Sequence, residues 1–127
     1  MRAILTPDDL KRGELVTPGW HPAEITGYEE KDAATDSSTN CIFSFKIFDG
    51  GDKGKTANRL FNEKALGFGK ALWAVLGAPR TADGGYELTS QFFQSQVGKK
   101  LKIYIKIGKS NKGNEFNDVA DFMPLEN

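Results

Sequence analysis

Hydrophobic and polar residues alternate strictly over residues 100–108. Four aliphatic side chains share one side of this segment, and Lys102, Tyr104 and Lys106 share the other. An alternation of period two is typical of a strand that buries one face. Similar patterns predict four further strands, over residues 20–28, 41–48, 56–62 and 115–122.

The period changes to that of a helix over residues 63–77, where apolar side chains cover much of the circumference. Gly77 and Pro79 end this predicted helix. Residues 89–97 predict a second, short helix that Thr89 or Ser90 caps. Residues 29–40 are polar and lack apolar anchors, so they predict a loop.

The predicted order is therefore three strands, a helix, a short helix and two strands. We expect an all-β fold with one main helix, in which five strands close into an OB-fold barrel and the helix plugs one end. A split β-sandwich and an α+β sheet covered by the helix are the alternatives. A chain of 127 residues fits a single domain, with an N-terminal extension at 1–17, the barrel at 18–123 and a tail at 124–127.

The charges are unevenly distributed, although 17 basic and 17 acidic side chains cancel. Residues 53–113 carry twelve basic and three acidic side chains, which gives a net charge of +9, while the segments before and after carry −5 and −4. Residues 98–113 contain six lysines and no acid. This block is either a solvated edge strand, in which lysines prevent aggregation, or a basic binding surface.

A single-stranded nucleic acid needs cations for its phosphates and flat rings for its bases. The strand at 100–108 alternates lysine, tyrosine and lysine on its polar side, and the neighbouring strands and loops offer similar residues. Phe48 and Phe61 fit a core position equally well. The candidate nucleic-acid-binding residues are Tyr28, Lys46, Phe48, Lys53, Lys55, Arg59, Phe61, Lys102, Tyr104, Lys106, Lys109 and Lys112.

Metal, cofactor and catalytic sites find little support in the sequence. The single Cys41 excludes an internal disulfide and a multi-cysteine zinc site, and His21 is the only histidine. A metal-dependent nuclease would need clustered carboxylates, and the candidates are Asp49 with Asp52, and Glu115 with Asp118 and Asp121. Because these acids lie in a flexible turn or on both faces of one strand, we expect no enzyme activity, no metal and no cofactor.

The cellular setting is predicted from what the chain lacks. No stretch approaches the ~20 apolar residues of a membrane span, and charged residues and proline come too early for a secretory signal. Together with the single cysteine, these features predict a reducing, cytoplasmic setting and no membrane partner.

Beyond these patterns, the chain resembles the short OB-fold single-stranded DNA-binding proteins that phages encode near recombination and replication genes. The resemblance covers about residues 15–123. It rests on Pro18-Gly19, Phe43-Ser44-Phe45-Lys46-Ile47, Arg59-Leu60-Phe61, Gly67-Phe68-Gly69-Lys70-Ala71-Leu72, Gly98, Leu101-Lys102-Ile103, Asn117 and Phe122. The chain departs from the family at Trp20-His21-Pro22, where a plainer strand start is expected.

The resemblance implies sequence-independent binding of single strands in phage replication or recombination. The partners expected are single-stranded DNA, replication or recombination proteins, and other copies of the chain, in the cytoplasm of a host cell. The alternatives are a protein-binding assembly module that binds no nucleic acid and, third, a metal-dependent nuclease.

Overall fold

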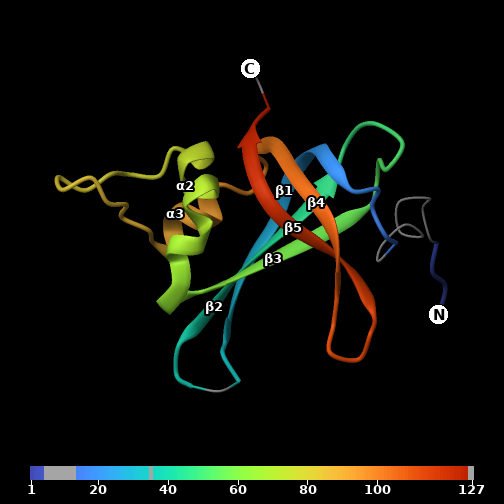
Figure 1. The fold of residues 1–127 in the computed structure, drawn as a ribbon, viewed down its shortest axis with the longest axis horizontal. Helices are drawn as coiled ribbons and strands as arrows, with labels where there is room; N and C mark the ends of the chain where they lie inside the picture. The colour runs from blue at the N-terminus through green and yellow to red at the C-terminus, as the bar shows by residue number, and fades with distance from the viewer. Residues whose placement is uncertain (5–13, 35, 126–127) are drawn as a thin grey trace.

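The computed structural model describes residues 1–4, 14–34 and 36–125 (Figure 1). Residues 5–13 of the predicted N-terminal extension and residues 126–127 of the predicted tail lie outside the described residues. In chain order the elements are β1 (Gly19–Asp32), β2 (Thr39–Ile47), β3 (Thr56–Asn62), the 3₁₀ helix η1 (Glu63–Gly69), α2 (Lys70–Leu76), α3 (Ser90–Ser95), β4 (Lys100–Lys109) and β5 (Glu115–Pro124). All five predicted strands are present, so a mostly β fold is confirmed.

The five strands form one antiparallel sheet in the order β3-β2-β1-β4-β5. The predicted closed barrel is not confirmed, because β3 and β5 are the two edges of an open sheet. Side chains nevertheless join these edges. The Nη1 of Arg59 on β3 donates to the carbonyl of Val119 on β5 at 2.8 Å, and the Nδ2 of Asn117 on β5 donates to the carbonyl of Thr56 at 3.1 Å.

A short N-terminal segment lies across this open seam. Val16 is only 2% exposed and belongs to the core. Its N–H donates to the Oδ1 of Asn117 at 2.7 Å, and the Nδ2 of Asn117 also donates to the carbonyl of Glu14 at 2.9 Å. Asn117 therefore bonds to β3 and to the N-terminal segment at once. These bonds satisfy polar groups that an open edge would otherwise leave unpaired.

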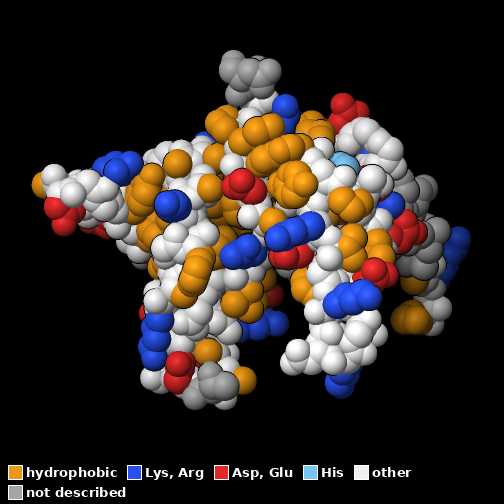
Figure 2. Space-filling model, in the orientation of Figure 1, with side chains coloured by type: hydrophobic (Ala, Val, Ile, Leu, Met, Phe, Trp, Pro, Cys, Tyr) orange, Lys and Arg blue, Asp and Glu red, His pale blue; other side chains and the backbone are white. Residues whose placement is uncertain are grey.

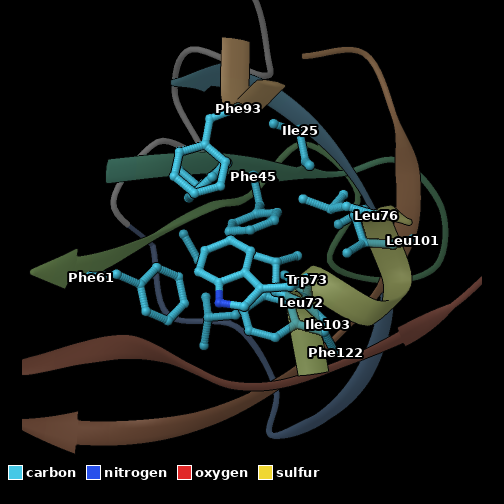
Figure 3. Packing of buried hydrophobic residues seen from close by; sticks show 14 of the residues in the cluster. Ile25, Phe45, Phe61, Leu72, Trp73, Leu76, Phe93, Leu101, Ile103 and Phe122 are labelled. Carbon is cyan, nitrogen blue, oxygen red and sulfur yellow. The ribbon is translucent and has the colours of Figure 1, made fainter. Parts of the chain in front are cut away.

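The core lies between the curled sheet and the helices, with Trp73 of α2 near its centre (Figure 3). The indole N–H of Trp73 donates to the carbonyl of Leu66 at 2.7 Å. A Cβ on Gly69 would lie 2.5 Å from the indole, so only glycine permits this approach. None of the helices in the described part of the chain has the length and apolar character of a membrane span.

Two predicted boundaries need correction. The single helix expected over residues 63–77 is η1 followed by the seven-residue α2, since Ala65 has non-helical torsion angles and glycines interrupt the segment. The loop expected over residues 29–40 is shorter, because β1 and β2 stay paired as far as Asp32 opposite Thr39. The predicted short helix is confirmed as α3, with the Oγ1 of Thr89 accepting from the N–H of Phe92 at 3.1 Å.

Candidate nucleic-acid interface

Strand β4 presents its lysines and its tyrosine on the outer side of the sheet. Leu101, Ile103 and Ile105 are fully buried, so the residues between them point the opposite way. Of these, Lys102 and Tyr104 are half-buried and Lys106 is exposed. The three residues that the alternation placed on one side of this strand do share one face.

Trp20 of β1 lies directly opposite Tyr104 on the same face. The two rings are in edge contact, with centroids 5.3 Å apart and planes at 71°. Trp20 keeps 39% of its surface exposed, which leaves ring area open to a ligand. A tryptophan and a tyrosine held side by side on an exposed sheet give a ready surface for stacking bases.

A further ring, that of Phe48, lies where β2 ends. Its N–H donates to the carbonyl of Pro22 on β1 at 3.2 Å, and the Nζ of Lys100 lies 5.0 Å from the ring centroid. Lys46, Phe48 and Lys53 line one hollow of about 220 Å³ together with Glu24, Thr26 and Ile47. Three predicted binding residues are thus brought together beside β1.

The fourth ring lies at the far end of β4. Phe116 of β5 is opposite Gly108 and is 46% exposed. Its ring covers Gly108, since a Cβ there would lie 2.6 Å from the Phe116 Cζ. The predicted residues Lys109 and Lys112 are exposed at the following hairpin. We call this surface the aromatic–basic face, and its members are Trp20, Phe48, Lys100, Lys102, Tyr104, Lys106 and Phe116.

Acidic residues also lie on this side of the sheet. Asp118 is opposite Lys106, Asp121 is opposite Tyr104, and Glu24 is opposite both Lys46 and Lys100. In Figure 2, hydrophobic, basic and acidic side chains lie next to one another across the middle of the molecule. The acids weaken the attraction of the lysines for an anion, so the positive potential of this face is smaller than its lysines alone would give.

Four predicted residues lie elsewhere, and Tyr28 is the first of them. It was expected on the outer side with Glu24, but the register of β1 shifts between Ile25 and Gly27. This bulge turns Tyr28 toward the core, where its ring centroid lies 4.9 Å from Phe43 and 5.3 Å from Phe93. Burial raises the pKa of the Tyr28 hydroxyl, which donates to Glu30 at 2.6 Å.

Phe61 and Arg59 face inward from β3. Phe61 is 2% exposed and packs against Trp73 with centroids 5.1 Å apart. The guanidinium carbon of Arg59 lies 4.6 Å from the Phe61 centroid, and this side chain also joins β3 to β5. Ala57, Arg59 and Phe61 share the side of β3 that covers the core, so Phe61 takes the core position that the sequence had left open.

Lys55 holds the N-terminal segment in place. Its Nζ lies 2.7 Å from the buried carboxylate of Asp52 and donates to the carbonyl of Leu15 at 2.9 Å. The hydrogen bond from Lys55 lowers the pKa of Asp52. Asp52 also accepts from the N–H of Thr17 at 3.3 Å. Lys55 therefore makes structural bonds on this loop.

We compared the chain with family models and with curated proteins. No family model matches the chain, and no curated protein matches it. The case for a function therefore depends on the face itself.

Trp20, Lys100 and Phe116 are not among the residues predicted from the sequence. Spacing alone could have found two of them, because Trp20 is an even number of residues from Glu24 and Lys100 is two residues before Lys102. Phe116 could not be found in this way, because the register of β5 shifts between it and the buried Phe122. Within the described residues, no group of three or more His, Cys, Asp or Glu side chains is placed to hold a metal ion.

Proposed function

We propose that the protein binds single-stranded DNA, without sequence preference, along the aromatic–basic face. One observation carries the proposal: the exposed Trp20 of β1 and the half-buried Tyr104 of β4 form an edge-to-face pair on the same side of the sheet as the lysines of β4. Stacking on rings is sequence-tolerant because every base has a π-face, and lysines neutralise phosphates whatever the base.

The length of the face supports a strand as the ligand. From Lys100 to Gly108, β4 advances eight residues, or roughly 26 Å at about 3.3 Å per residue. At the ~3.4 Å rise of a stacked strand this corresponds to about eight nucleotides, within the roughly 4–16 nucleotides that one OB fold covers.

We further propose that the curled sheet is an OB-fold barrel left partly open between β3 and β5. The bonds from Arg59 and Asn117 across this seam support that reading, since OB folds are partly open five-stranded barrels. Figure 1 shows the β1–β2 and β4–β5 hairpins projecting from the same side of the molecule, as the two loops that flank an OB-fold ligand do. The aromatic residues differ in lying mainly on β1, β4 and β5. Together with the family resemblance, this fold favours a role in phage replication or recombination.

A fluorescence-polarisation titration with labelled oligo-dT tests the proposal. The three lysines of the aromatic–basic face, Lys100, Lys102 and Lys106, predict that log K falls with log salt with a slope of about −2, at ~0.7 per neutralised phosphate. Duplex DNA of equal length should bind more weakly. Absence of binding at low salt would overturn the proposal and favour an assembly module. Shortening of the labelled strand with magnesium or manganese would instead identify a nuclease.

A further inference from the structure

Phe68 on η1 is an exposed ring outside the aromatic–basic face. It keeps 81% of its surface exposed, although the adjacent Gly69 is buried against the indole of Trp73. The Phe68 ring lines a hollow of about 580 Å³, and Lys64 and Lys70 line the same hollow. The packing of Gly69 thus anchors η1 to the core, while the neighbouring Phe68 ring stays in solvent beside a hollow that two lysines also line.

Strands β3 and β5 connect this site to the aromatic–basic face. Lys106 lies opposite Asp118 on β5, and the carbonyl of the next residue, Val119, accepts from Arg59 on β3 at 2.8 Å. Strand β3 then leads directly into η1, which starts at Glu63. In Figure 2, Lys and Arg side chains lie at intervals from the helical side at the left to the β4–β5 hairpin at the right.

We propose that Phe68, Lys64 and Lys70 form a second stacking site for the single strand that the aromatic–basic face binds. This inference rests on the proposed function and extends it to longer strands. Its support is the same chemistry, an exposed ring and two lysines that line one hollow, with further Lys and Arg side chains at intervals between the two surfaces (Figure 2). Lys64 lies 3.2 Å from Asp36, but both side chains are well exposed, so solvent weakens this pair and a phosphate can replace the carboxylate.

The test compares two lengths of oligo-dT, about eight and about 20 nucleotides, the shorter chosen to fill the aromatic–basic face alone. The Phe68→Ala variant should bind the long strand about fivefold or more weakly, as loss of one stacked base implies, and should bind the short strand like the wild type. Ile4→Ala, which also removes an exposed apolar side chain, is the control. Unchanged affinity of Phe68→Ala for the long strand, or an equal loss at both lengths, would overturn the inference.

A charge variant gives an independent measurement. Lys70→Gln should reduce the salt slope for the long strand by about 0.7 and leave the slope for the short strand unchanged, whereas Arg2→Gln should change neither. A slope equal to the wild type would overturn the role of Lys70. Binding of the short strand by the wild type tests the proposed function separately. If the short strand binds and Phe68→Ala has no effect on the long one, only the second site fails.

Discussion

Replacing Tyr104 with alanine removes one ring from the aromatic–basic face and keeps its cations. Tyr104 is half-buried on the outer side of β4, while Ile103 and Ile105 on either side remain in the core. We therefore expect the Tyr104→Ala variant to fold, which its circular dichroism and thermal unfolding can verify. The substitution also removes the edge contact with Trp20 at 5.3 Å.

The expected magnitude follows from these two contacts. A base stacked on a ring contributes ~1–3 kcal/mol, so affinity for oligo-dT should fall by about five- to 150-fold. The Trp20–Tyr104 contact contributes ~0.5–1.5 kcal/mol to the stability of the fold, so the free energies of unfolding of Trp20→Ala, Tyr104→Ala and the double variant should deviate from additivity by a similar amount. The salt slope should stay unchanged, because the lysines remain.

Polarisation titrations at several salt concentrations measure both quantities. Tyr104→Phe keeps the ring and should bind like the wild type, while Lys102→Gln should lower the salt slope by about 0.7. Ile4→Ala serves as the control for an exposed side chain outside the face. If Tyr104→Ala binds as tightly as Ile4→Ala, the face has been assigned wrongly and the stacking argument fails.

Three further predictions concern packing, pH and charge. Gly69→Ala should lower the free energy of unfolding in urea by about 1–3 kcal/mol, because its Cβ would overlap the buried indole of Trp73. In the control Gly67→Ala the new Cβ meets open space, so the free energy of unfolding should not change. Equal losses in the two variants would contradict this packing. Lys55 lowers the pKa of Asp52, so this carboxylate stabilises the fold above its unfolded-state pKa of about 3.9 and loses that contribution as pH falls through the lower folded-state value. Lys55→Gln should therefore reduce the loss of stability between neutral and acid pH, and an unchanged acid profile in thermal unfolding would refute the pairing. Asp121→Asn should tighten oligo-dT binding at low salt, since it removes an acid opposite the central ring of the face; weaker binding would mean that the strand runs elsewhere.

The local alternation of residues was enough to predict the strands and one side of the site. Strand β3 matches its predicted bounds, and β4 and β5 extend one and two residues further. Lys102, Tyr104 and Lys106 lie on one face because a regular strand turns successive side chains to opposite sides. Hydrophobic neighbours that must be buried then determine which side faces solvent.

Residues that depend on irregular backbone or on distant partners could not be placed from the sequence. The bulge after Ile25 reverses the side of the sheet that Tyr28 faces. The alternation of apolar and polar residues does not predict this bulge. Lys55 and Arg59 are ordinary cations in the sequence, and only the folded chain brings them to Asp52 and to the carbonyl of Val119. The tertiary structure therefore determines whether a lysine or arginine makes an internal hydrogen bond or stays available to bind an anion.

The tertiary structure, and not the local sequence, determines how far the sheet closes. Alternation predicts five strands, each with one apolar side, but it does not determine which edges form a hydrogen-bonded ladder. In the structure β3 and β5 come close together but form no backbone hydrogen-bonded ladder. The gap between them is bridged by the side chains of Arg59 and Asn117 and by the segment around Val16. The sequence by itself thus determined the strands and the alternating face of β4, whereas the curl of the sheet decided which rings are core and which remain exposed, because burial depends on what packs against each face.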